Sequence, residues 1–316
     1  MSSSLSKLVL VGALFLILNN IAFSYEILNT PTCQINNKQQ SPIDVDPFNT
    51  FYREEKYFHL VLSNYTAFNS SWVNVVEERA IGFVNSNNTD WGFVQFVKDW
   101  SIYKFNLKKV LFRYRSGHTI DGRRYDVEME LFHEIDNTFR TSGRYIKPSS
   151  DHLVISVFFM ADSANSELMK SNFFNYTNLE RYTEQTTSDS AFFTRLLKLN
   201  QLVQNSGSYF YEGANTYGDC SNVWRLLLPK YQLIYQSQFA NLRTIVSKLG
   251  YIDVNVPSSS NSRNQQQVNQ DTRVYRNTPQ SERILIEQSY HQYVKAQGIK
   301  LSLFAFFVSL LIMLFA

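Results

Sequence analysis

Four charged residues on two neighbouring segments are the first candidates for chemistry in this chain. Arg113 and Arg115 alternate with aromatic residues in FRYR, and Glu128 and Glu130 flank Met129 in EME. Alternate residues of a β-strand share a face, so each pair would project from one side of its strand. A guanidinium keeps its proton, so it can donate hydrogen bonds to a carboxylate or another anion but cannot bind a metal. The pattern fits either solvated outward faces or an ion-paired cluster inside the protein.

The segments that carry these charges are predicted to form a strand pair over residues 112–134. Asp121-Gly122 lies between them and supplies the positive φ angles that a tight hairpin turn needs. A helix is predicted over residues 237–249 from its apolar spacing, with Gly250 as the terminator. Further short strands, at a spacing that indicates an all-β core, are predicted at residues 59–62, 72–76, 81–84, 92–97, 109–114, 125–134, 153–160, 208–211 and 223–228.

Other segments give weaker patterns. Residues 165–172 are consistent with a helical turn, residues 188–202 with a short amphipathic helix, and residues 283–287 with a last strand. Residues 258–271 are polar and of low complexity, which predicts a disordered loop.

The composition sets broad bounds on the class of protein. The 316 residues include 15% aromatic and 44% hydrophobic residues, which is ample for a large core. The formal net charge is +3 and no dense basic cluster occurs, so nucleic acid is not an expected partner.

The N-terminus has the pattern of a secretory signal peptide over residues 1–24. Lys7 precedes the apolar residues 8–18, and Ala22-Phe23-Ser24 places small residues at the two positions that determine cleavage. The alternative is an uncleaved membrane anchor, although the apolar run is short for a span.

The C-terminus ends in a hydrophobic tail, residues 301–316, after a polar spacer at residues 288–300. A GPI-anchor signal and a short transmembrane anchor both fit this tail. Ser289 has a suitable spacer, but His291 is not small, and near Ala296 the spacer is too short. Either anchor would tether the domain to the outer face of the cell membrane.

Cysteine and glycosylation patterns agree with a secretory route. Cys33 and Cys220 are the two cysteines of the chain, and one disulfide is the simplest prediction behind a signal peptide, with two free thiols as the alternative. Four N-x-[ST] sequons occur, at Asn64, Asn69, Asn87 and Asn175.

Several motifs, in the same order along the chain, resemble those of α-carbonic anhydrases. The most specific are QSPID at residues 40–44 and SGHTIDG at residues 116–122, the latter followed by Tyr125-Asp126 and Glu128. Residues 154–165, 211–224 and 277–283 resemble later segments of the family. The resemblance covers residues 25–287 and implies a mostly β fold: a large twisted, mainly antiparallel sheet of about ten strands with peripheral helices. The cysteine pair also coincides with the disulfide of secreted members.

The resemblance places the family's zinc site on the charged strand pair. Family enzymes bind Zn²⁺ with three histidines, two in an H-x-H and one in an E-x-H. In this chain these positions hold Arg113, Arg115 and Glu130, so the resemblance implies three substituted ligands and no metal. The resemblance also implies a deletion of two residues between Arg115 and Ser116 relative to the family.

Other site positions differ as well. Gly117 stands where the family has a glutamate, and no histidine lies between His59 and His118, where the proton-shuttle histidine is expected. Thr216 keeps the position of the threonine that orients the zinc-bound hydroxide, and Glu128 keeps that of the glutamate that orients the third histidine.

These observations predict a zinc-free, catalytically inactive carbonic-anhydrase-like module. It would be displayed outside the cell, where it binds an unknown extracellular protein or a small anion, or has a structural role. The alternative is an active zinc carbonic anhydrase with relocated ligands, for which the candidates are His118, His133 and His152.

Overall fold

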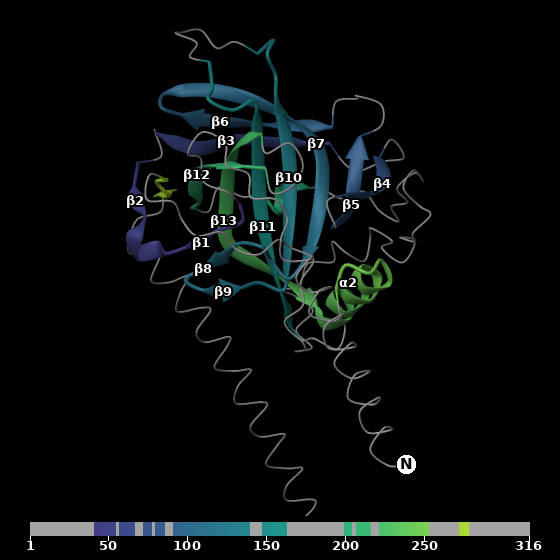
Figure 1. Cartoon of the computed structure of the whole chain (residues 1–316). Helices are drawn as coiled ribbons and strands as arrows, with labels where there is room; N and C mark the ends of the chain where they lie inside the picture. Colours follow the sequence, from purple (N-terminus) through teal and green to yellow (C-terminus); the bar gives the residue numbers. More distant parts are fainter. Residues whose placement is uncertain are drawn as a thin grey trace, which may run out of the picture.

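A large curled β-sheet forms the centre of the molecule (Figure 1). The computed structural model describes residues 41–54, 57–66, 72–77, 80–85, 91–139, 147–162, 199–203, 207–215, 221–252 and 272–277. The strands of the sheet are β2 (Phe51–Tyr52), β3 (Phe58–Tyr65), β4 (Trp72–Glu77), β5 (Ala80–Asn85), β6 (Gly92–Lys98), β7 (Ser101–Tyr114), β10 (Val127–Ile135), β11 (His152–Asp162), β12 (Tyr209–Ala214), β13 (Asn222–Tyr235) and β14 (Tyr275–Arg276).

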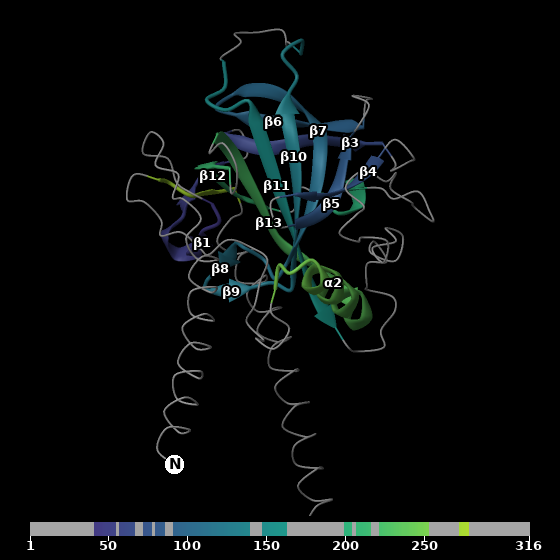
Figure 2. The ribbon, with the colours of Figure 1, turned by 45° about the vertical axis from the view of Figure 1, so that its right-hand side comes forward.

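The main path of this 11-stranded sheet runs β2-β14-β12-β13-β11-β10-β7-β5-β4, and β6 joins β3 to β7. The pairs are antiparallel except β11 with β13 and β14 with β2, which are parallel. The first half of the long strand β7 pairs with β6 and the second half with β5, which divides the sheet along β7. Figure 2 shows the resulting curl, with β3 and β6 crossing one end of the long central strands. The predicted fold class is confirmed.

A second, small sheet holds the predicted turn. β1 (Asp44–Val45), β8 (Thr119–Ile120) and β9 (Arg123–Arg124) form this three-stranded sheet. Asp121 and Gly122 have φ angles of 55° and 68°, as the prediction of a tight turn requires. The turn joins β8 to β9, however, and the two long strands that carry the charges, β7 and β10, pair separately in the main sheet.

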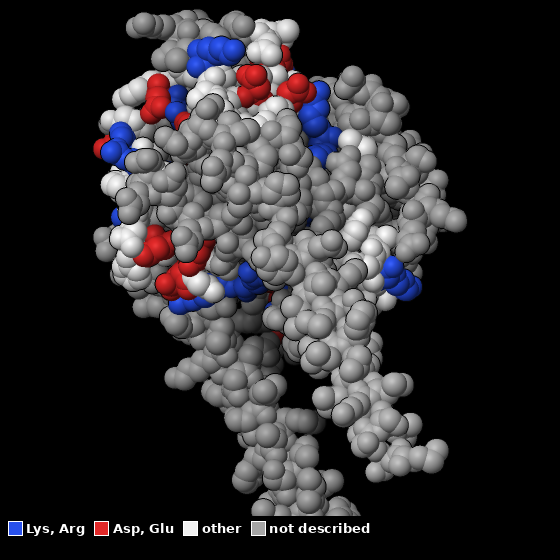
Figure 3. Space-filling model, in the orientation of Figure 1, with Lys and Arg blue, Asp and Glu red and all other residues white. Residues whose placement is uncertain are grey.

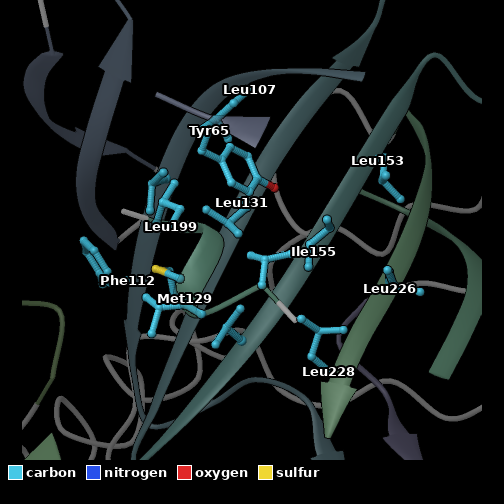
Figure 4. Packing of buried hydrophobic residues seen from close by; sticks show 14 of the residues in the cluster. Tyr65, Leu107, Phe112, Met129, Leu131, Leu153, Ile155, Leu199, Leu226 and Leu228 are labelled. Carbon is cyan, nitrogen blue, oxygen red and sulfur yellow. The ribbon is translucent and has the colours of Figure 1, made fainter. Parts of the chain in front are cut away.

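Apolar side chains cover both faces of the main sheet. The larger cluster lies on one face and includes Phe112, Met129, Ile155 and Leu226 (Figure 4). Helix α2 (Gln236–Lys248) adds to it through Leu242, Ile245 and Val246, and confirms the predicted helix. Gly250, with φ 71°, follows the helix as predicted.

The same alternation gives the opposite face two smaller clusters. One includes Phe158, Tyr209 and Leu227, and the other includes Leu111 and Val154. Charged side chains, which alternation also places on this face, lie beside them. The opposite face therefore holds the candidate functional site.

The largest differences from the predicted strand lengths are in β7 and β13. β7 begins at Ser101 because it also pairs with β6, and β13 continues past Pro229 to Tyr235. The β11–β13 pairing shifts register between Val157 and Phe159, which accommodates the proline in an interior strand.

Several sequence predictions lie outside the described residues. They are the signal peptide, residues 165–172, 258–271 and 283–287, the C-terminal tail, both cysteines, Thr216, Asn69, Asn87 and Asn175. Of the helix predicted at residues 188–202, the described part includes a 3-10 turn at Leu199–Gln201. Asn64 is exposed on β3. Within the described ranges, no helix has both the length and the apolar character needed to cross a membrane.

Candidate functional site

Three buried charged side chains meet on the face of the sheet opposite the large core. Glu130 of β10 accepts from Arg113 Nε of β7 through Oε2, at 2.9 Å, and from Arg225 Nη1 of β13 through Oε1, at 2.7 Å. The three residues are 2%, 2% and 0% exposed. We call this group the Arg-Glu-Arg triad. The interpretation of these charges as solvated outward faces is therefore wrong for Arg113 and Glu130.

The register of three strands explains why the triad forms. Arg113 lies opposite Glu128, two residues before Glu130 on the same face of β10. Arg225 approaches from two strands away: Glu130 lies opposite Ser156 of β11, and Val154, two residues earlier, lies opposite Arg225 of β13. Alternation keeps all of these side chains on one face.

Glu128 forms a second buried cluster beside the triad. Its Oε2 accepts from the backbone N–H groups of Gly117 and His118, at 2.9 and 3.1 Å, and its Oε1 lies 2.6 Å from His118 Nδ1. The other ring nitrogen, His118 Nε2, lies 2.7 Å from the Tyr211 hydroxyl, which is 2.7 Å from Ser41 Oγ. Glu128 thus fixes the loop between β7 and β8.

Charge pairing decides the ionisation of both glutamates. Burial raises the pKa of Glu130, but the charges of Arg113 and Arg225 outweigh burial and lower that pKa from 4.5 to about 2. Burial also raises the pKa of Glu128, and the contact with His118 brings it below its ordinary value. Both carboxylates are therefore ionised at neutral pH. Glu130 contacts the two guanidinium groups, and Glu128 contacts His118.

Arg115 does not join the triad. β7 ends at Tyr114, and Arg115 has a φ of 57°, which turns the chain out of the strand. Its backbone N–H donates to Asp126 O at 2.7 Å. Burial raises the pKa of Asp126 and lowers that of Arg124; the charge of Arg115 opposes the first shift and adds to the second. Arg115 is half-buried, beside the small sheet. The predicted pairing with Glu130 is confirmed for Arg113, whereas Arg115 lies beyond the end of the strand.

Comparison with known proteins identifies the family. The family model described as eukaryotic-type carbonic anhydrase matches residues 26–278. The chain belongs to the carbonic anhydrase family. Its fold is similar to those of solved α-carbonic anhydrases from Thermovibrio ammonificans, in complex with sulfanilamide, and from Photobacterium profundum. It is also similar to dioscorin in complex with ascorbate.

These similarities are distant and extend over most of each chain. The Thermovibrio protein is 21% identical with a TM-score of 0.54, and the alignment covers 77% of this chain and 88% of that one. The Photobacterium protein is 18% identical with a TM-score of 0.52, covering 75% and 88%. Dioscorin is 19% identical with a TM-score of 0.53, covering 75% and 85%. They establish a shared carbonic anhydrase fold.

The triad does not fit the zinc ion that the carbonic anhydrase family implies. Neither Arg113 nor Arg225 has a lone pair to offer a metal, and each oxygen of Glu130 already accepts a guanidinium hydrogen bond. Across the described ranges, no group of three His, Cys, Asp or Glu residues has an arrangement that could hold a metal ion.

The three candidate histidines lie in separate environments. His118 is held between Glu128 and Tyr211. His133 lies on the opposite face of β10, where Tyr65 OH is 2.9 Å from its Nε2 and the Leu153 carbonyl is 3.2 Å from its Nδ1. His152 is exposed at the start of β11. These side chains do not converge on one point.

Arg225 is the site residue that sequence reasoning missed. The strand at residues 223–228 is predicted, and its sequence, VWRLLL, contains one arginine among apolar residues. A charge inside an apolar run is the signal that could have identified it, because a buried charge needs a partner. The partner could not be named without the β10–β11–β13 register.

Proposed function

We propose that this carbonic anhydrase family member does not hydrate CO₂ and acts as a binding or structural module on the outer face of the cell membrane. The observation that carries the proposal is the Arg-Glu-Arg triad. By resemblance, Arg113, Arg115 and Glu130 stand at the three zinc-ligand positions. The triad uses two of these positions, Arg113 and Glu130, and adds Arg225, so charge-assisted hydrogen bonds take the place of metal coordination.

Burial and pairing support a structural role for the triad. Removing two arginines and two glutamates from water is costly, and the charges are tolerated because each has a partner. Arg113 and Arg225 both pair with Glu130, and Glu128 pairs with His118. Arg113 Nε and Arg225 Nη1 already donate hydrogen bonds to Glu130. These hydrogen bonds favour a site filled by paired side chains over a site that binds a small anion. We therefore place recognition of a partner elsewhere on the molecule.

Zinc content and CO₂ hydration of the protein purified from a secreting eukaryotic host test the proposal. We expect substoichiometric zinc, no hydration above the uncatalysed rate, and no change in melting temperature on addition of a chelator. Glu130→Gln serves as a matched variant, because a true zinc site that used Glu130 would lose metal with it. Stoichiometric zinc together with hydration that a sulfonamide abolishes would contradict the proposal.

The tether is tested separately in cells that express the full chain. We expect the protein at the cell surface, with glycans on its sequons. Release by a phosphatidylinositol-specific phospholipase would identify a GPI anchor, and resistance to it would favour the transmembrane tail. A purely intracellular protein would contradict the surface location without bearing on the triad.

A further inference from the structure

A pocket of about 520 Å³ lies at the edge of the main sheet, on the face opposite the triad. Phe210 and Glu212 of β12 line it, whereas Tyr211 between them points to the face that holds His118. β14, the start of β3 and the turn from β6 to β7 supply the rest of its wall. In Figure 1 these elements lie around β2 and β12, on the other side of the molecule from α2.

Two arginines of this pocket have no carboxylate partner within the described part of the chain. Arg53 lies over the rings of Tyr57 and Tyr275, at 5.0 and 5.5 Å, and Arg273 over the ring of Phe51, at 5.5 Å. Stacking occupies the flat face of a guanidinium and leaves its N–H edge available for a planar oxyanion. The rings of Phe51 and Tyr275 are 6.2 Å apart, so the two arginines lie on neighbouring rings.

The remaining charges of the pocket are paired with each other. Lys98 Nζ lies 2.9 Å from Asp99 and 3.3 Å from Glu212. Three cations against two carboxylates leave the lining with one net positive charge, from the Arg53 and Arg273 side. This balance favours a ligand with one negative charge and disfavours a dianion, which the two carboxylates would repel. Elsewhere on the surface, basic and acidic side chains are interspersed over the described part of the face in Figure 3.

The inner wall of the pocket is aromatic. Phe58 and Phe210 are each 2% exposed, with ring centroids 5.5 Å apart, and Tyr275 lies 6.4 Å from Phe58. The rings of Phe58 and Phe210 are buried behind the wall, and the half-buried rings of Tyr57 and Tyr275 supply its accessible surface. A flat apolar group of a ligand could lie against that surface while its charged end reaches the arginines.

We propose that this pocket binds a small monocarboxylate with a flat apolar body. The carboxylate is bound by Arg53 and Arg273, and the body lies against the half-buried rings of Tyr57 and Tyr275. The site is independent of the triad and of whether the protein binds zinc. It provides a recognition function on the face of the sheet that the carbonic anhydrase site does not use.

Titration calorimetry of the full glycosylated protein with phenylacetate tests this site. We expect saturable binding, and binding at least about tenfold weaker for the neutral analogue phenylacetamide, because a hydrogen bond to a charged group is lost. Phenyl phosphate, a dianion near neutral pH, should bind no more tightly than phenylacetate. Affinity should fall with added salt, since the pocket is open to solvent.

Charge-removing variants locate the binding. Arg53→Gln and Arg273→Gln should each weaken phenylacetate binding about tenfold or more. Lys248→Gln, which removes an exposed cation at the end of α2, should leave binding unchanged. Melting temperatures show that each variant is folded. The proposal would be overturned if phenylacetate showed no saturable binding or if phenylacetamide bound as tightly as phenylacetate. It would also be overturned if both arginine variants bound phenylacetate as tightly as the unsubstituted protein.

Discussion

Arg225 Nη1 donates to Glu130 Oε1 at 2.7 Å, and this contact joins two fully buried residues that lie 95 positions apart in the sequence. Arg113 completes the arrangement from the other side. In this member of the carbonic anhydrase family, the centre of the sheet is therefore held by ion pairs that span β7, β10 and β13. The consequences for stability can be measured directly.

Breaking the triad from one side should be strongly destabilising. Arg225→Met leaves Glu130 with one guanidinium partner, and we expect the free energy of unfolding to fall by about 3–5 kcal/mol in urea denaturation. Lys230→Met removes an exposed cation from the same strand and should change it by less than about 0.5 kcal/mol. Equal effects of the two substitutions would contradict the burial of the triad.

Replacing the whole triad should cost less than breaking it. Arg113→Met, Glu130→Leu and Arg225→Met together remove both the desolvation cost and the pairing, so no member is left unpaired. We expect the triple variant to be more stable than Arg225→Met alone. If the free energy of unfolding of the triple variant instead fell by the sum of the three single-substitution losses, the ion pairs themselves would provide the stability.

Glu130 should contribute to acid unfolding in a defined pH range. Its folded pKa, about 2, lies below the ordinary 4.5, so the folded state favours the ionised carboxylate. Its contribution is complete above pH 4.5 and is lost as the pH falls toward 2, amounting to about 3 kcal/mol. Glu130→Gln should lack this portion of the pH dependence, as measured by urea unfolding at each pH. A variant with an unchanged profile would place the acid sensitivity elsewhere.

His133 should make the folding stability depend on pH in a higher range than Glu130 does. Burial lowers its pKa from 6.5 to about 4, and the hydrogen bond to the Leu153 carbonyl opposes this shift only in part. The unfolded chain therefore binds a proton more readily, and stability is lost as the pH falls from 6.5 to 4, by about 3 kcal/mol. His133→Gln should remove this portion, whereas His152→Gln, at an exposed position, should retain it.

Gly82 should tolerate no side chain. A Cβ there would lie 1.9 Å from the Val110 carbonyl oxygen and 2.9 Å from Leu111 Cα, which are backbone atoms of the neighbouring strand. We expect Gly82→Ala to lower the free energy of unfolding by about 3 kcal/mol or more. Gly250→Ala has open space and a φ of 71°, so only the backbone cost of about 1 kcal/mol applies. The reverse order would contradict the close approach of β5 to β7.

The sequence by itself determined much of this architecture. Alternation and turn residues predicted most strand segments, the Asp121-Gly122 turn and the helix before Gly250, because these depend on local periodicity and backbone preference. Glu128 and Glu130 were assigned a common face from spacing alone. The motif order indicated the family, which in turn indicated that the charged face is buried.

Tertiary structure alone decided which charges meet. Alternation predicts that Arg115 shares a strand face with Arg113. However, β7 ends at Tyr114, and the positive φ of Arg115 turns its backbone toward Asp126. Arg225 takes the place at Glu130 because the register of β10 with β11, and of β11 with β13, brings it there. Strand pairing links residues far apart in the chain, and no local pattern encodes its register. The partner of a buried charge is therefore known only once the sheet is assembled.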